Sequence, residues 1–203
     1  MKISILGTGP VAQAIGSGLA AVGHEVAYGS RTPDRKTLNL PVVSIEIAAA
    51  QGEIVINALP GRLSVEILSS LEESLRGKIL IDVANAVTDK FELKYPNASL
   101  AAALQNALPE TRVVKTLSTI NASVMAKPSV LAGRGSVFLS GNDDSAKSTV
   151  ARLLTDLGWT DEAQEDLGDI TSARGPEHYF FLAVGIGGVV GRPEYSIAVV
   201  RAA

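Results

Sequence analysis

The sequence predicts an α/β fold of the doubly wound Rossmann type, in which helices cover both faces of a mainly parallel sheet. Three observations predict it: short runs rich in Val and Ile alternate with helical patterns, the first run leads into a glycine-rich turn, and an amphipathic helix follows that turn at once. Continuous apolar strands separated by helices are typical of parallel sheets that are buried on both faces.

Six segments are expected to form strands, because each is a short apolar run next to a turn or a helical pattern. A first helix begins at Pro10, which suits the first helical position, and a second spans about residues 143–157. The expected strands are Lys2–Leu6, Glu25–Tyr28, Glu53–Asn57, Lys78–Val83, Arg112–Thr116 and Ser136–Leu139.

The 203 residues are expected to form a single domain, since the length is close to that of one domain and no linker interrupts the chain. Within it, residues 167–203 are expected to add a helical C-terminal extension. This extension is broken by the glycine-rich segment Val184–Gly191 and by Pro193.

The composition excludes several classes of function. Eighteen Lys and Arg against 21 Asp and Glu give a net charge of −3, which leaves no basic surplus for binding nucleic acid. Without cysteine the chain has no disulfides and no thiolate zinc site, and we expect no metal. The apolar run after Met1-Lys2 has only five residues, which is too short for the core of a signal peptide. The uncharged stretch His178–Gly191 falls short of a membrane span, so we expect a cytoplasmic protein that binds no membrane.

The glycine-rich turn Gly7-Thr8-Gly9-Pro10-Val11-Ala12 has the G-x-G-x-x-A pattern of dinucleotide-binding proteins. The first glycine allows a tight turn, the second lets the backbone approach a pyrophosphate, and the small Ala12 lets the helix pack on the strand. The phosphates would then lie at the N-terminus of the helix. A ligand-free glycine turn of another α/β fold is the alternative.

The end of the second strand favours NADP over NAD. Enzymes that use NAD usually carry Asp or Glu there, whereas this sequence has Tyr28-Gly29-Ser30-Arg31-Thr32. Arg31 can pair with a 2′-phosphate that a carboxylate would repel, Ser30 and Thr32 add hydroxyl donors, and Arg35 is near enough to join. A polar surface loop is the alternative interpretation.

Two further strand ends point to the same edge of the sheet, where α/β proteins bind ligands. The small and amide residues there suit contact with a ribose and a nicotinamide, or they satisfy turn backbones. No histidine or carboxylate stands out as a general acid or base. The residues are Asn57, Ala58, Leu59 and Pro60 after one strand, and Ala84 and Asn85 after the other.

Several segments together resemble the family of coenzyme F420-dependent NADP oxidoreductases. The mammalian ferric reductases called STEAP carry a similar cytoplasmic domain. The resemblance covers nearly the whole chain. It rests on Ile5–Gly9 with Gly23–Val26, Gly29-Ser30-Arg31, Val113–Ile120, Leu139–Asp144, and Asp166-Leu167-Gly168 with Ala173, Arg174 and Glu177.

The resemblance implies a Rossmann fold whose C-terminal helices support a homodimer. It implies hydride transfer between NADPH and a small redox acceptor, namely coenzyme F420 or a flavin such as FMN or FAD. Carried over by position, Thr8, Gly9, Pro10 and Val11 hold the pyrophosphate, and Ser30, Arg31 and Arg35 take the 2′-phosphate. The face for hydride transfer would comprise Ser118, Thr119, Ile120 and Ala122, with no residue assigned as acid or base.

Two other functions stay open at this point. The absence of a catalytic side chain is compatible with an NADPH sensor, or a module that docks to a partner, without turnover. A reductase of small carbonyls or imines, with an active site built across a dimer, would need Lys115, Ser118 or Thr119 as its proton donor. Arg174 and Glu177 are charges in an apolar segment and are expected to form a structural pair or to belong to a dimer pocket.

Overall fold

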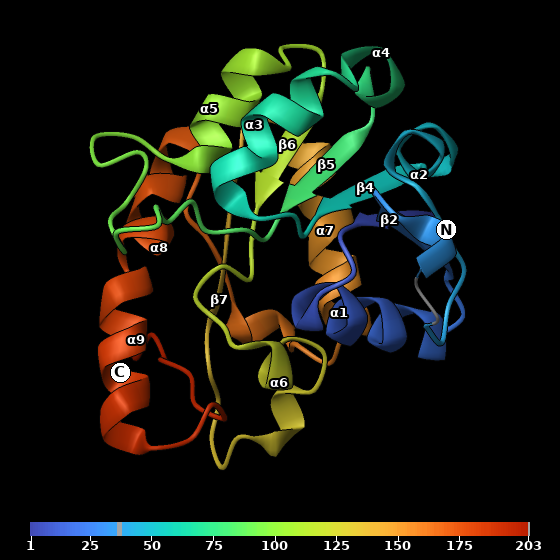
Figure 1. Cartoon of the computed structure of the whole chain (residues 1–203). Helices are drawn as coiled ribbons and strands as arrows, with labels where there is room; N and C mark the ends of the chain where they lie inside the picture. Colours follow the sequence, from blue (N-terminus) through green and yellow to red (C-terminus); the bar gives the residue numbers. More distant parts are fainter. Residues whose placement is uncertain (36–37, 203) are drawn as a thin grey trace.

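The computed structural model describes residues 1–35 and 38–202, with the side chain of Arg35 left out. Within this part of the chain one eight-stranded sheet has the order β3-β2-β1-β4-β5-β6-β7-β8 (Figure 1). Neighbouring strands are parallel, except that β7 runs antiparallel to β6. The strands are β1 (Lys2–Leu6), β2 (Glu25–Ser30), β3 (Val42–Ser44), β4 (Ile54–Asn57), β5 (Ile79–Asp82), β6 (Arg112–Lys115), β7 (Val137–Gly141) and β8 (Gln164–Asp166). The predicted Rossmann fold is confirmed.

The helices cover both faces of the sheet, and Figure 1 shows α3, α4 and α5 on one side with α1 and α6 on the other. The α-helices are α1 (Pro10–Ala21), α2 (Ile45–Gln51), α3 (Gly61–Ser69), α4 (Glu72–Leu75), α5 (Leu100–Ala107), α6 (Ala122–Met125), α7 (Asp144–Asp156), α8 (Arg174–His178) and α9 (Phe180–Val190). Short 3-10 helices are η1 (Pro33–Arg35), η2 (Pro128–Val130), η3 (Asp161–Ala163) and η4 (Ile170–Ala173).

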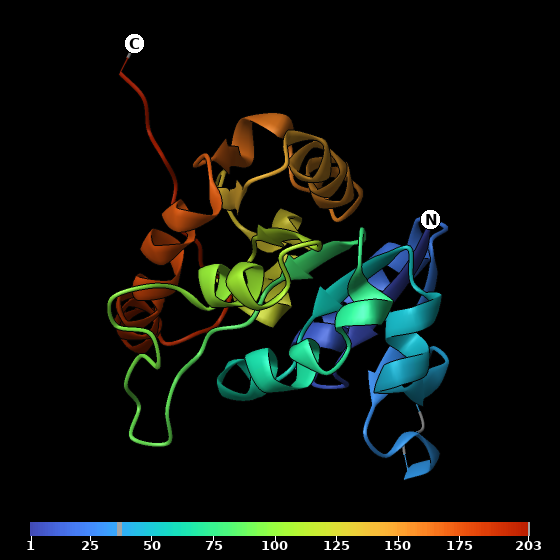
Figure 2. The same cartoon turned by 90° about the horizontal axis from the view of Figure 1, so that it is seen from above.

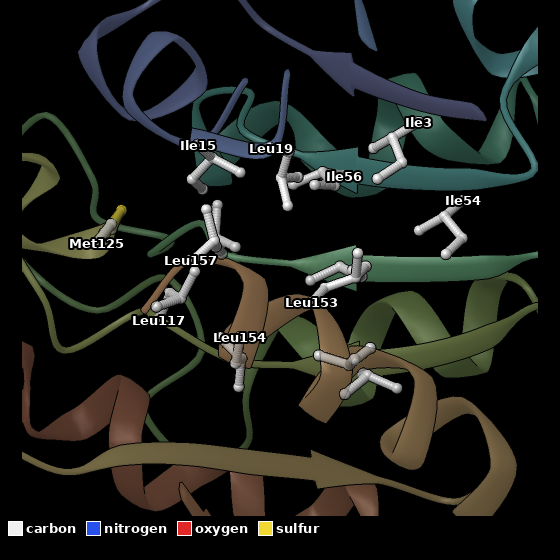
Figure 3. Close-up of a cluster of buried hydrophobic side chains, with 14 of the residues drawn as sticks. Ile3, Ile15, Leu19, Ile54, Ile56, Leu117, Met125, Leu153, Leu154 and Leu157 are labelled. Carbon is white, nitrogen blue, oxygen red and sulfur yellow. The ribbon is translucent and has the colours of Figure 1, made fainter. Parts of the chain in front are cut away.

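Successive strand residues point into two separate apolar cores. Ile3 and Ile5 of β1 belong to the core that α1, α6 and α7 cover, whereas Leu6 belongs to the core of α2, α3 and α5. Figure 3 shows the first core, where Leu19 of α1 and Leu153 of α7 lie between the two helices and the sheet. Because both faces are covered, the strands carry continuous apolar sequence.

All six predicted strands are present. Lys2–Leu6 has the predicted bounds and the other five differ by one or two residues at an end. The structure adds two strands that the sequence did not indicate. β3 and β8 have three residues each, which is too short for a periodic pattern. The expected break at Val184–Gly191 is wrong, because α9 continues through Gly185, Gly187 and Gly188 to Val190. The division of the chain at residue 167 stays a prediction.

Residues after α9 run without regular structure to residue 202 and return to the sheet. The Ser136 amide donates to Ile197 O at 2.7 Å, and the Val199 amide donates to Ser136 Oγ at 2.9 Å. Arg201 then pairs with Glu165 of β8. In both views α8 and α9 lie at the opposite end of the molecule from β2 and α2 (Figures 1 and 2).

No described helix combines the length and the apolarity that a membrane crossing requires.

Gly7 sits where two parallel strands end side by side. Its φ is +123°, and a Cβ at this position would lie 2.5 Å from the carbonyl oxygen of Ala58. The Gly7 amide also donates to Gly29 O at 2.9 Å, which ties the turn to the end of β2. Both the backbone angle and the space therefore require glycine.

We expect Gly7→Ala to lower the free energy of unfolding by more than about 1 kcal/mol, because alanine is strained at this φ and meets Ala58. Urea denaturation measures the loss. Gly9→Ala is the matched control, since Gly9 has an extended backbone with φ −77° and open space beside its Cβ position. Equal losses for the two variants would contradict the assignment of strain to Gly7.

Candidate functional site

Two adjoining cavities lie along the carboxyl edge of the sheet, where the loops after β1, β2, β4, β5 and β6 meet. Their volumes are about 640 Å³ and about 540 Å³. Five residues line both cavities, namely Pro10, Val11, Ala58, Leu59 and Pro60. The two cavities thus form one continuous site over the centre of the sheet.

The first cavity, which we call the glycine cleft, surrounds the start of α1. Gly9 is the N-cap of α1, and no side chain caps the helix there, so the first-turn amides are left for another partner. The open space beside Gly9 keeps the approach to these amides clear. The cleft is lined by Gly7, Thr8, Gly9, Pro10, Val11, Gly29, Ser30, Arg31, Thr32, Ile45, Ala58, Leu59, Pro60, Leu63 and Ile67.

The far end of the glycine cleft carries the polar residues that follow β2. Ser30 is buried and its Oγ accepts from the Thr32 amide at 3.1 Å, which shapes the turn. Arg31 and Thr32 are exposed, and Arg31 has no carboxylate partner among the described residues. Arg35 ends η1, and its side chain lies outside the described residues.

The second cavity, the central cavity, lies between the ends of β4, β5 and β6 and the helix α9. It holds all four residues expected at the hydride-transfer face, together with Ala84 and Asn85. The lining residues are Pro10, Val11, Ala58, Leu59, Pro60, Gly61, Val83, Ala84, Asn85, Ser118, Thr119, Ile120, Asn121, Ala122, Met125, Phe180, Ala183, Val184 and Tyr195.

Two residues that line the central cavity each carry a buried polar atom that lacks a hydrogen-bond partner within the described residues. These atoms are Ser118 Oγ and Asn85 Oδ1. Asn85 Nδ2 donates to Ser118 O at 2.7 Å, which joins the two residues. Leu117, just before Ser118, has a φ of +59°, which is rare for a leucine and turns the chain sharply at the end of β6.

Sequence reasoning missed the C-terminal wall of the central cavity. Phe180, Ala183 and Val184 come from α9, and Tyr195 comes from the segment that follows it. The aromatic run Tyr179-Phe180-Phe181 is visible in the sequence, but its pattern does not indicate which cavity it reaches. Val83, Asn121 and Met125 were missed as well.

Asn57 lines neither cavity, so the ligand contact expected of it is wrong. It is fully buried, and its Nδ2 donates to Asp82 Oδ1 at 2.8 Å and to Ser64 Oγ at 3.0 Å. Its Oδ1 accepts from the Leu59 amide at 3.3 Å. Its side chain is therefore occupied in holding the loop after β4 rather than in contact with a ligand.

Lys115 is also held away from the cavities. It is 1% exposed, with Nζ 2.8 Å from Asp82 Oδ2 and 3.1 Å from Glu177 Oε1. Glu177 therefore pairs with Lys115, and Arg174 lies exposed on the surface. The pair expected between Arg174 and Glu177 is wrong, while the structural role of Glu177 holds.

The two carboxylates determine the charge of Lys115. Burial acts to lower its pKa, but the charges and hydrogen bonds of Asp82 and Glu177 outweigh burial and raise the pKa above the usual lysine value. The stabilisation is thus fully present below about pH 10.4 and is lost only as the pH rises through the folded-state pKa. At neutral pH Lys115 stays a cation, and because it lines neither cavity it is out of reach as a proton donor to a molecule bound there.

No group of three or more His, Asp or Glu side chains that could hold a metal occurs in the described part of the chain.

Comparisons with known proteins agree with this geometry. A sequence model of the family described as NADP oxidoreductase, coenzyme F420-dependent, matches residues 2–86. Metalloreductase STEAP3 of Rattus norvegicus is 33% identical over 178 residues, which are 85% of this chain and 35% of that protein. The chain thus spans about a third of the length of STEAP3. The F420-dependent NADP reductase of Methanocaldococcus jannaschii is 28% identical over 180 residues, covering 77% of this chain and 80% of that protein.

A solved structure matches along the whole length. It is a protein of Arthrobacter sp. FB24, provisionally described as an F420-dependent NADP reductase, with a TM-score of 0.94 and 38% identity. The match covers 99% of this chain and all of that one. The resemblance expected from the sequence is confirmed, and the chain belongs to the family of coenzyme F420-dependent NADP oxidoreductases.

Proposed function

We propose that this protein transfers a hydride between NADPH and a small planar redox acceptor, either coenzyme F420 or a flavin. The observation that carries the proposal is the continuity of the two cavities. The glycine cleft suits the phosphates of a dinucleotide, and the central cavity has room for two stacked rings at its end.

The glycine cleft fits the phosphates of NADP(H). The uncapped first turn of α1 offers amides and the positive end of the helix dipole to the pyrophosphate, and Gly9 leaves the approach open. Thr8, Pro10 and Val11 complete the cradle around it. Ser30, Arg31 and Thr32 bind the 2′-phosphate, which an unpaired guanidinium attracts strongly, and Arg35 is proposed to join them.

The central cavity takes the nicotinamide and the acceptor. Ala58, Leu59 and Pro60 join the two cavities, so the cofactor passes over them, and Ala84 and Asn85 lie beside the ring. Ser118, Thr119, Ile120 and Ala122 form the opposing face. Among the described residues that line this cavity there is no Asp, Glu, His, Lys or Arg. Hydride transfer between two redox rings requires alignment rather than a proton-transfer residue, and this wall supplies alignment.

Ser118 and Asn85 favour an acceptor with an amide-like edge. The Ser118 hydroxyl can donate a hydrogen bond and Asn85 Oδ1 can accept one, and neither has a partner among the described residues. A buried polar group without a partner costs about 1–3 kcal/mol, which a ligand that supplies the partner recovers. Flavins and deazaflavins carry adjacent C=O and N–H groups on the pyrimidine ring, so they match this pair.

We also propose that the protein is a homodimer that associates through α9. Of its eleven residues only Ala183 is buried, while Leu182 is 58% exposed and Val189 is 90% exposed. A helix that is apolar on all sides and exposed needs a cover. The α9 helix of a second copy is equally apolar and can cover it. Gly185 and Gly188 allow the two helices to approach closely.

Anaerobic oxidation of NADPH, with coenzyme F420, FMN and FAD offered in parallel, tests the function. We expect turnover with at least one of these acceptors and a clear preference for NADPH over NADH. The reaction is followed by the loss of the near-ultraviolet absorbance of NADPH. Saturable NADPH binding without turnover on any acceptor would contradict the enzyme assignment and support an NADPH sensor.

Arg31→Glu tests the 2′-phosphate site. We expect the Kd for NADPH to rise by about tenfold to a hundredfold, because a charge-assisted hydrogen bond contributes about 1.5–3 kcal/mol. The Kd for NADH should not change, since NADH lacks the phosphate. Arg152→Glu on α7 carries the same charge change outside both cavities and is the control. Equal losses for both cofactors would overturn the assignment of Arg31.

Light scattering tests the dimer. We expect the mass of a dimer for the native chain and that of a monomer for Val189→Lys, because a charge on the exposed face of α9 opposes its burial. Val200→Lys is the matched control, since Val200 is 87% exposed and lies outside α9. A native monomer, or the same effect from both variants, would contradict the proposed interface.

A further inference from the structure

One buried cation connects three of the segments that form the central cavity, although it lines neither cavity itself. Lys115 ends β6, and its ammonium contacts one carboxylate from β5, one from α8, and a backbone carbonyl of the loop after β5. The proposed hydride transfer makes no use of this group, so its place in the molecule needs another explanation.

The first connection runs to the loop after β5. Lys115 Nζ donates to Ala84 O, and Ala84 is part of the cavity wall. The Ala84 amide in turn donates to Asp82 Oδ1 at 3.2 Å. Lys115 and Asp82 thus hold both backbone groups of one wall residue.

The second connection runs through Asp82 to the loop after β4. Asn57 Nδ2 donates to Asp82 Oδ1 at 2.8 Å, and Asn57 Oδ1 accepts from the Leu59 amide at 3.3 Å. Leu59 lies on the wall that the two cavities share. The position of this wall therefore depends on the same carboxylate that Lys115 binds.

The third connection runs to the C-terminal helices. Glu177 Oε1 lies 3.1 Å from Lys115 Nζ, and the carboxylate also accepts from the Leu100 amide at 2.6 Å and the Ala101 amide at 3.1 Å. Phe180, three residues after Glu177, begins α9 and lines the cavity. The helical wall is thus tied to the strand ends at one point.

We propose that Lys115 is a positioning residue for hydride transfer, which fixes the separation of the strand-end wall and the helical wall of the central cavity. This inference rests on the proposed function. Two stacked rings react only near contact distance, and a displacement of about 1 Å can cost about a hundredfold in rate. Stability alone is a weak explanation, because buried ion clusters are often no more stabilising than apolar packing of the same volume.

Loss of the cation would leave Asp82 and Glu177 facing one another. The other groups nearby are the first amides of α5, the neutral side chain of Asn57, and Tyr95, whose pKa is raised by burial and by the charge of Glu177. Among the described residues no second cation contacts either carboxylate. Without Lys115 the two charged carboxylates would repel each other.

The test compares Lys115→Met with Lys147→Met. Lys147 is a second buried lysine that pairs with two carboxylates, Asp144 and Asp166, but it lies outside both cavities. We expect Lys115→Met to lower kcat by about tenfold or more while the Kd for NADPH changes by less than about threefold. Among the described residues, none of those proposed to hold the phosphates is hydrogen-bonded to Lys115, Asp82 or Glu177. Lys147→Met should leave both constants unchanged and affect only the melting temperature.

A double variant separates the loss of the cation from the repulsion that this loss creates. Lys115→Met/Glu177→Gln removes one of the two carboxylate charges and should recover part of the kcat that Lys115→Met loses. The same variant keeps the test available if the single variant does not fold.

Hydrogen exchange gives a readout that is independent of turnover. Lys115→Met should speed exchange of the amides of residues 84–86 and 100–101, and Lys147→Met should not. Unchanged exchange at these amides, or an equal loss of kcat in both lysine variants, would overturn the positioning role. Wild-type protein that oxidises no NADPH with any acceptor would instead overturn the proposed function, and the exchange data would still show whether Lys115 holds the walls.

Discussion

The parallel pairing of β1 with both β2 and β4 is the constraint on which the rest of the site depends. The chain leaves β1 through α1 on one face of the sheet and reaches β4 by way of α2 on the other. Loops that depart to opposite faces leave a crevice above the strand ends, and this is where α/β proteins bind ligands. Gly7 lets the end of β1 lie against the end of β4 at that point, because no side chain separates it from Ala58.

The sequence predicts the central part of the fold well, since strands and helices there have strong patterns. Lys2–Leu6 and the helix from Pro10 appear as expected, and the glycine cleft gathers Gly9, Ser30 and Arg31 in one place. Local chemistry determines these features: a glycine turn, a proline at the first helical position, and an apolar strand. Such local features can be predicted from a single sequence.

Features that depend on contacts between distant parts of the chain are harder to predict from the sequence. Asn57 carries a polar side chain at a strand end, as a ligand contact would, yet the carboxylate of Asp82 from the next strand draws it into the interior. The partner of Glu177 is 62 positions away in sequence, so proximity along the chain wrongly favoured Arg174. In the same way the glycines of α9 argued for a break by propensity, although tertiary contacts override propensity in a helix.

The C-terminal segment contributes to only one half of the site. Among the described residues, the lining of the glycine cleft comes from residues 7–67, whereas α9 and Tyr195 line the central cavity alone. Substitutions in α9 or at Tyr195 can therefore change the shape of the central cavity while the lining of the glycine cleft stays as it is. Such a change requires no rearrangement of the sheet, because neither α9 nor Tyr195 belongs to a strand.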